Sequence, residues 1–182
     1  MRQLKYHERK LLKKVNFLSY KREREEREKQ ITVRYVLQDR DDYKKYNKLC
    51  GKITKLVDVL RQLEPTDPTR LELTQNLLDK LYNAGVTHVK KSLVQCERIS
   101  VSSFARRRLA VVMVRLRMAQ YISEAAAFIE QGHVRVGPTT VTNPAFHVTR
   151  NMEDFVTWVD TSKIKAKVLK FNDQLDDYDV LN

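Results

Sequence analysis

The chain has 182 residues, and its 35 Lys and Arg against 23 Asp and Glu give a formal net charge of +12. A chain of this length is expected to form one domain, or one small domain with ordered extensions. No stretch approaches eighteen uncharged apolar residues, so the sequence predicts no membrane span, and its first residues lack the apolar core of a secretory signal.

The residue types that build cofactor and metal sites are sparse and scattered. Cys50 and Cys96 lack CxxC spacing, which excludes a zinc finger or a cysteine-rich disulfide scaffold and suits a reducing compartment. None of the glycines belongs to a phosphate-binding or dinucleotide-binding motif, and no two histidines have a helical metal-ligand spacing. Without a nucleophile–base set, the sequence predicts a protein that is not an enzyme and uses no cofactor or metal.

The positive charge is concentrated in two parts of the chain. Residues 1–60 carry a surplus of nine positive charges and residues 101–136 a surplus of four, whereas residues 137–182 have a net charge of −2. A polyanion is therefore expected to bind these two basic parts. The acidic end, with four aspartates in the last twelve residues, is more typical of a solvated tail than of a functional site.

The N-terminal part of the chain is predicted to be helical. Residues 4–29 indicate a basic helix, which is either solvated along its second half or an arm that orders on RNA or a partner protein. A second helix is predicted over 42–63, with Asp41 or Asp42 as its cap. One buried stripe on this helix is predicted to consist of Leu49, Ile53, Leu56, Leu60 and Leu63.

A third helix is expected after a short turn. Asp67 followed by Pro68 is typical of a helix start, and Gly85 is placed to end the helix in the left-handed conformation. Residues 86–101 then predict an irregular connection with room for one short strand.

Two further helices are predicted to begin a small module over residues 102–160. Ser102 and Ser103 are placed to cap a helix over 104–118. A second short helix is predicted over 122–131, because its apolar residues fall on one face.

The rest of the module predicts a small antiparallel sheet. Residues 133–136 alternate polar and apolar side chains, a turn follows, and the return strand is expected to begin at Val141. Residues 155–159 are a further strand candidate, in which Trp158 is more typical of a core residue than of a base-stacking one. The predicted fold class is therefore α+β.

Several residues of this module occur in the order of a known family pattern: Arg107-Arg108-Leu109, Arg115-Leu116, Ala119, Ala125, Ile129, the run from Gln131 to Val136, and the run from Asn143 to Phe146. This set resembles the small RNA-binding module, or αL motif, of the small-subunit ribosomal protein S-four family, over about 104–160. The resemblance implies that two helices pack on the sheet and present a basic face to structured RNA.

The remaining segments extend the resemblance essentially from end to end: Leu4 to Val15, Arg40 to Asn47, Leu78 to Tyr82, and Asn151 to Asp160. They resemble the Imp-three family of the eukaryotic small-subunit processome. That resemblance implies a nucleolar assembly factor of the U-three small nucleolar ribonucleoprotein, which helps U-three small nucleolar RNA pair with pre-ribosomal RNA. It also implies the Mpp-ten protein and other processome subunits as partners. A constituent protein of the mature small ribosomal subunit is the alternative.

Eight residues of the module are the predicted RNA contacts: Arg106, Arg107, Arg108, Arg115, Arg117, Gln131, His133 and Arg135. On one straight helix, Arg108 and Arg115 would share one side. Arg106 and Arg117 would share the opposite side, so the arginines cannot all contact one RNA surface. Arg108 and Arg115 also border the apolar stripe, so each is alternatively a side chain packed on the core. For His133 the alternative is a hydrogen-bonded turn residue.

The chain departs from the ribosomal pattern around the second module helix. Gln120 and Ala126 occupy frequent basic sites, and Tyr121 replaces a capping Ser or Thr, so RNA contacts are expected to shift to the arginine-rich helix and the N-terminal arm. The predicted organisation is a basic arm over 1–30, a helical region over 31–101, the S-four-type module over 102–160, and a C-terminal tail with an acidic end over 161–182.

Overall fold

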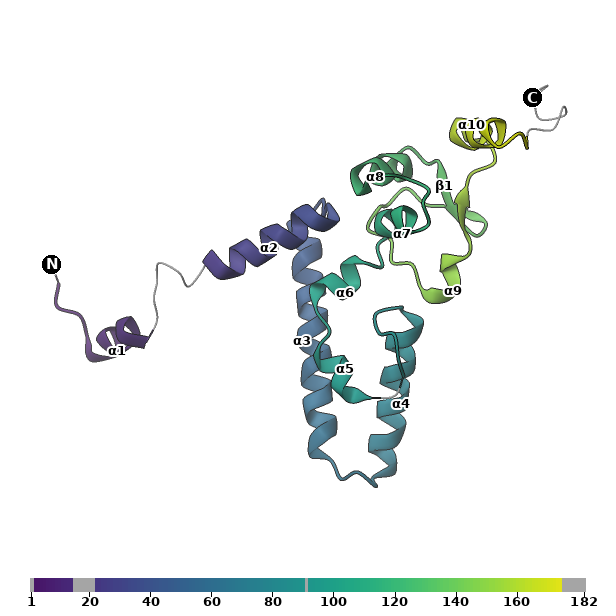
Figure 1. The fold of residues 1–182 in the computed structure, drawn as a ribbon. Helices are drawn as coiled ribbons and strands as arrows, with labels where there is room; N and C mark the ends of the chain where they lie inside the picture. The colour runs from purple at the N-terminus through teal and green to yellow at the C-terminus, as the bar shows by residue number, and fades with distance from the viewer. Residues whose placement is uncertain (1, 15–21, 91, 175–182) are drawn as a thin grey trace.

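The computed structural model describes residues 2–14, 22–90 and 92–174 and confirms an α+β fold in which helices predominate (Figure 1). Its elements, in chain order, are α1 (Tyr6–Lys14), α2 (Arg22–Tyr35), α3 (Arg40–Gln62), α4 (Pro68–Asn83), α5 (Leu93–Glu97), α6 (Val101–Ala105), α7 (Leu109–Arg115), α8 (Ile122–Glu130), β1 (Val134–Val136), β2 (Thr139–Thr140), α9 (Arg150–Glu153), β3 (Val156–Trp158) and α10 (Lys163–Phe171).

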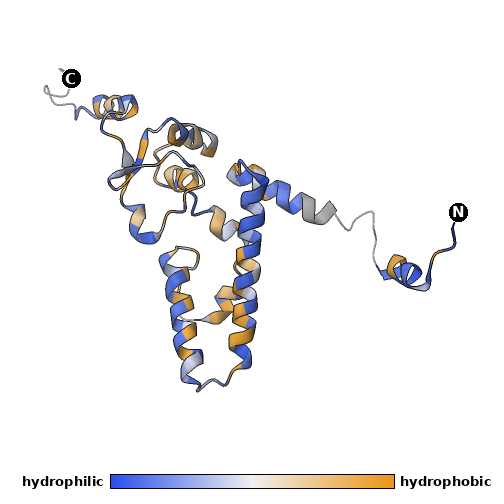
Figure 2. Cartoon of the chain, turned by 180° about the vertical axis from the view of Figure 1, so that it is seen from behind, coloured by the Kyte–Doolittle hydropathy of each residue, from blue (hydrophilic) through white to orange (hydrophobic). Residues whose placement is uncertain are grey.

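The basic helix predicted over 4–29 is represented by two helices, α1 and α2, and residues 15–21 of that prediction lie outside the described residues. Figure 2 shows mainly hydrophilic residues along the coloured part of α2, whereas α3, α4 and the C-terminal half of the chain also carry many hydrophobic ones. No helix among the described residues is both long and apolar enough to cross a membrane.

Helices α3 and α4 form a hairpin against which the short helices α5 and α6 pack (Figure 1). The predicted stripe on α3 was partly right, because Leu60 is buried and Ile53 packs against the core. It was wrong at Leu49 and Leu56, which are exposed, whereas Cys50 and Val57 are buried. The reason is that α5 and α6, as well as α4, contact α3, which turns its buried side by about one residue from the side marked by the leucines.

The ends of the hairpin helices follow local chemistry. Asp67 accepts a hydrogen bond from the Thr69 amide at 3.0 Å, and α4 begins at Pro68, as predicted. Gly85, just after α4, has a φ of +73°, which confirms the left-handed end. The predicted cap of α3 was wrong, because the residue before this helix is Asp39 and its side chain makes no capping bond.

The module packs α7 and α8 on a three-stranded antiparallel sheet of order β2-β1-β3 (Figure 1). Its central residues are fully buried and come from both helices, β1 and the segment before α9: Leu109, Val112, Met113, Ala125, Ile129, Val134 and Val148. Trp158 is half-buried and packs against the Phe128 ring in a T-shaped arrangement, with 5.8 Å between ring centroids, a packing role as predicted.

Three local predictions in this half of the chain were wrong. The helix expected over 104–118 is divided into α6 and α7, and α6 begins ahead of the proposed serine caps. The connection 86–101 contains a helix, α5, instead of a strand. The return strand begins at Thr139, two residues early. Within the segment predicted as a C-terminal tail, residues 163–171 form α10.

The division between α6 and α7 has a long-range cause. The Leu109 amide donates to the Phe146 carbonyl at 2.9 Å, and the Val148 amide donates to the Arg107 carbonyl at 2.9 Å. Arg108 is extended, with φ −68° and ψ 143°, and forms an isolated antiparallel bridge with His147. The chain at the three consecutive arginines therefore pairs with a distant segment instead of continuing as a helix.

Candidate nucleic-acid interface

The turn between α6 and α7 carries three arginines in different environments. Arg108 is only 2 % exposed, and its Nη1 donates to Asp42 Oδ2 of α3 at 2.7 Å. The Tyr46 hydroxyl lies 3.4 Å from the same nitrogen. Because a buried guanidinium needs a paired carboxylate, this contact fastens the module to α3.

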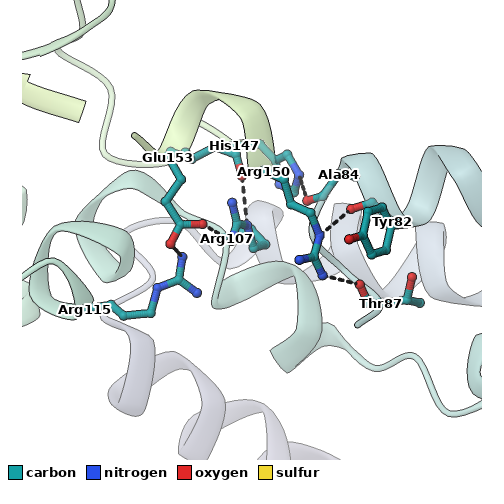
Figure 3. Close-up of polar contacts among 9 residues, drawn as sticks. Tyr82, Ala84, Thr87, Arg107, Arg115, His147, Arg150 and Glu153 are labelled. Carbon is teal, nitrogen blue, oxygen red and sulfur yellow. Dashed lines mark hydrogen bonds and ion pairs between the residues drawn. The ribbon is translucent and has the colours of Figure 1, made fainter. Parts of the chain in front are cut away.

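Arg107 is also buried and crosses from the module toward the end of α4 (Figure 3). Its Nε donates to the Val148 carbonyl and its Nη1 to Glu153 Oε2, both at 2.9 Å. A Cβ at Gly85 would lie 2.6 Å from Arg107 Nε, closer than side-chain carbons approach. Gly85 is therefore required both for its backbone angle and for the passage of this guanidinium group.

Two more cationic or polar side chains bind the carbonyl end of α4, where helix acceptors lack intrahelical partners. Arg150 donates to the Tyr82 carbonyl at 2.9 Å and to the Thr87 carbonyl at 2.8 Å, with its guanidinium 4.1 Å from the Tyr82 ring centroid (Figure 3). His147 Nε2 lies 2.9 Å from the Ala84 carbonyl and therefore donates to it. Burial lowers the pKa of His147, and the charge of Arg107 acts in the same direction.

These contacts unite the helical region and the module, and sequence reasoning missed them. Arg150 and His147 stand in the stretch that follows the Asn143-Pro144 step, with no pattern to link them to α4. The available signal was Gly85, since a helix that ends there exposes carbonyl acceptors that need donors.

Three of the predicted RNA-binding arginines are exposed. Arg106 projects from the turn, and its Nε donates to the Tyr35 hydroxyl at 3.3 Å. Arg115 ends α7 and forms an ion pair with Glu153, which also accepts from Arg107 (Figure 3). Arg117 follows α7 with a φ of +61°. Burial alone would raise the pKa of Glu153, but the hydrogen bond and the charges of the two arginines lower it overall.

The other predicted contacts lie at β1. Gln131 is exposed just before the strand, and His133 Nδ1 is 3.0 Å from the Ser162 hydroxyl oxygen. Arg135 donates from Nε to Thr157 Oγ1 at 3.1 Å and from Nη1 to Asp160 Oδ2 at 2.6 Å. Asp160 also accepts from Lys165, whose hydrogen bond is the main reason that the pKa of Asp160 is lowered, with the Arg135 charge adding to it.

The eight predicted contacts are thus not one surface. Arg107 and Arg108 are interior and hold the two halves of the chain together. Arg115 and Arg117 lie at the end of α7, Arg106 lies beside α2, and Gln131, His133 and Arg135 form a separate group at β1. Among the described residues, no cluster of three or more His, Cys, Asp or Glu side chains is placed to hold a metal ion.

Comparison with known families divides the chain at the arginine turn. The family model of the ribosomal protein S4/S9 N-terminal domain matches residues 3–106, and that of the S4 domain matches residues 107–154. The chain is 52 % identical over 180 residues to the U3 small nucleolar ribonucleoprotein protein IMP3 of Saccharomyces cerevisiae, with 98 % of each chain covered. The chain belongs to the IMP3 family.

Other relatives support this assignment and the sequence resemblance that predicted it. The protein of the same name from Homo sapiens is 50 % identical over 99 % of this chain and 98 % of its own length. The small ribosomal subunit protein uS4 of Picrophilus torridus is more distant, at 26 % identity over 79 % of each chain. Relatives in the IMP3 family are named as ribonucleoprotein components and not as enzymes, which agrees with the prediction of a non-catalytic protein.

Proposed function

We propose that this protein is a non-catalytic, RNA-binding assembly factor of the small-subunit processome, acting in the nucleolus as a component of the U3 small nucleolar ribonucleoprotein. The observation that carries the proposal is identity of about one half to two proteins of that name over nearly the whole chain. Because the match extends through the helical region as well as the module, it supports the function of the whole protein and not of an RNA-binding module alone.

The proposed RNA surface consists of the members of the predicted set that are not buried, namely the exposed Arg106, Arg115, Arg117 and Gln131 and the half-buried His133 and Arg135. Arg115 and Arg135 are each paired with a carboxylate at a partly exposed position. Exposed ion pairs contribute at most about 1 kcal/mol, so an RNA phosphate can replace the carboxylate at small cost. Arg107 and Arg108 act indirectly by holding the module against the hairpin.

The proposed action is electrostatic. U3 small nucleolar RNA and pre-ribosomal RNA repel each other as polyanions, and bound cationic side chains reduce that repulsion. A protein that also holds one strand single-stranded makes its bases available for pairing. The Mpp-ten protein and other processome subunits are the proposed protein partners, with the basic N-terminal arm as a further segment that binds RNA or one of these proteins.

A constituent protein of the mature small subunit is the second candidate, supported by the uS4 relative at 26 % identity. The higher identity to the IMP3 relatives favours the assembly factor. Sedimentation of cell extracts separates the two functions, because an assembly factor is expected with nucleolar precursor particles and absent from translating ribosomes. Co-sedimentation with translating ribosomes would favour the subunit protein.

Direct binding tests the proposed surface. The affinity of the full chain for transcribed U3 small nucleolar RNA is measured at several salt concentrations, and we expect a log–log slope of about −3 to −5 if four to six phosphates are contacted. The variant R106A/R115A/R117A should lose affinity and slope while remaining folded. The matched control K52A/K55A/R70A removes the same charge from the hairpin and should lose less. Equal losses would indicate unspecific charge attraction.

An annealing assay tests the proposed action separately. The full chain should accelerate pairing between transcribed U3 RNA and a pre-ribosomal RNA fragment, and R106A/R115A/R117A should accelerate it less. Pairing at the rate of the RNAs alone would contradict this mechanism even if the protein binds both.

A further inference from the structure

Helix α10 carries a basic face that belongs to neither family match, since the S4 match ends at residue 154. At 3.6 residues per turn, Lys163, Lys167 and Lys170 fall within about 60° of one another around the helix. All three are exposed, and no ion pair joins them to another residue that the structure describes. Such a row of unpaired cations, repeated along about two turns, is suited to an extended polyanion.

An aromatic side chain ends the same helix. Phe171 is 88 % exposed, the highest value among the large hydrophobic side chains in the described parts of the chain. With Ile164 and Val168 it forms a second face, adjacent to the lysines, at helical spacings of four and three residues. None of the residues of α10 is buried, so the helix contributes no side chain to the hydrophobic core. An exposed aromatic ring beside a cationic row is the combination that stacks unpaired bases while the backbone is bound.

The position of α10 is fixed by the proposed RNA-binding strand. Ser162, which is buried, accepts from the Ile164 amide at 3.2 Å and lies 3.0 Å from His133 Nδ1. The Val159 amide donates to the His133 carbonyl at 3.0 Å, and Asp160 bridges Arg135 and Lys165. Figure 1 shows α10 next to the sheet, at the end of the molecule opposite to the hairpin turn.

We propose that α10 is a second RNA-binding element, in which Lys163, Lys167 and Lys170 contact phosphates of a single-stranded segment and Phe171 stacks on one of its unpaired bases. The inference rests on the proposed function, because the single-stranded segment bound by α10 would be the continuation of the RNA bound at His133 and Arg135. An acidic protein helix is the competing occupant of α10. The lysine row and its attachment to the β1 residues favour RNA.

The test uses the full chain and transcribed U3 small nucleolar RNA. The variant K163A/K167A/K170A should make the log–log salt slope less negative by about 2 to 3 units, because each phosphate contact contributes about 0.7 to 0.9. The charge-preserving K163R/K167R/K170R should keep the wild-type slope. Since α10 buries no residue, thermal unfolding of both variants should match that of the wild type.

Phe171 has its own readout. F171A should weaken RNA binding by about fivefold or more without changing the salt slope, and F171W should restore the affinity, because stacking depends on the ring and not on charge. V168A, which shortens a neighbouring exposed apolar side chain, is the matched control and should leave the affinity unchanged. Equal losses for F171A and V168A would overturn the stacking role.

The outcomes separate the inference from the function on which it rests. Wild-type slope and affinity in K163A/K167A/K170A, together with weakened binding in R106A/R115A/R117A, would overturn the role of α10 and leave the proposed function intact. Loss of an acidic processome protein from pull-downs of the α10 variant, with RNA affinity retained, would overturn it in favour of protein docking. A wild-type chain that binds no RNA would overturn the proposed function itself.

Discussion

The arginine turn between α6 and α7 and the edge formed by β1 and α10 are both cationic, but they use their charge differently. At the turn, Arg107 and Arg108 are almost fully buried and bound to Glu153 and Asp42. At the edge, Arg135 and the α10 lysines are partly or fully exposed, and Asp160 is the shared counter-ion of Arg135 and Lys165.

The difference teaches that burial, and not residue type, decides whether a cationic side chain stabilises the fold or is available to bind RNA. A guanidinium removed from water costs several kcal/mol unless it is paired, so its partners are part of the fold. An exposed one loses little when its carboxylate is replaced by a phosphate. Variants at the turn should therefore change stability, whereas variants at the edge should change RNA binding.

The largest effect is expected from R108A. The substitution leaves Asp42, which is itself mostly buried, with only the exposed Lys45 ammonium group at 3.6 Å as a counter-ion. We expect a loss of about 3–5 kcal/mol in the free energy of unfolding, measured by urea titration. The double variant D42N/R108M removes both charges and should recover much of that loss. A cost below about 1 kcal/mol for R108A would place the turn in the same category as the exposed edge.

A smaller loss is expected from G85A. The φ of +73° costs an alanine about 1–2 kcal/mol, and the new Cβ would also displace the Arg107 guanidinium. The matched control is G51A, because Gly51 lies within α3 and an added Cβ there meets nothing within 4 Å. That variant should gain up to about 1 kcal/mol. Equal behaviour of the two alanines in urea unfolding would contradict the close passage of Arg107.

The next effect depends on pH and on His147. Its folded-state pKa is lowered by burial, so below the ordinary value of 6.5 the unfolded chain binds a proton that the folded chain does not. Stability should therefore fall as the pH decreases from about 7.5 through that value. H147Q, which can still donate to the Ala84 carbonyl, should have a flatter dependence in urea unfolding at each pH. The same slope in both proteins would show that His147 is not the cause.

The smallest effect on stability is expected from R115A. Arg115 and the buried Arg107 pair with the same carboxylate, Glu153, so the variant compares an exposed and a buried arginine with one shared partner. The Arg115 side chain is 49 % exposed, so the free energy of unfolding should change by less than about 1 kcal/mol. The salt slope for RNA binding should become less negative by about 0.7 to 0.9 units. A large loss of stability without a change in slope would assign Arg115 to the fold.

Local signals were sufficient for much of the fold. Asp67-Pro68 and Gly85 marked the limits of α4, and the alternation at 133–136 marked β1. These features are encoded within a few residues, by capping bonds, backbone angles and side-chain alternation. The buried side of α3 is not encoded locally, because it is determined by contacts with α5 and α6, which follow about thirty residues later.

The predicted RNA site was limited in the same way. Three successive arginines are compatible with a continuous helix, and only the pairing of the turn with residues 146–148 extends the chain at Arg108 and buries it. Asp42 and Glu153, the carboxylates that bind the two interior arginines, are 66 and 46 residues away in sequence. At α10 the lysines were visible, but the neighbouring aspartates favoured a tail, although Ile164, Val168 and Phe171 already had helical spacing.

The passage of Arg107 over Gly85 has a consequence for dissecting the protein. A fragment that starts at residue 107, where the S4 match begins, would separate Arg150 and His147 from the carbonyls of Tyr82, Ala84 and Thr87. A chimera with a hairpin from another protein would lose the same contacts, unless that hairpin had a glycine and free carbonyl groups at the positions equivalent to Gly85 and its neighbours. The boundary between the two family matches therefore lies within a network of hydrogen bonds that joins the helical region to the module. The two regions should be kept together in fragments and chimeras.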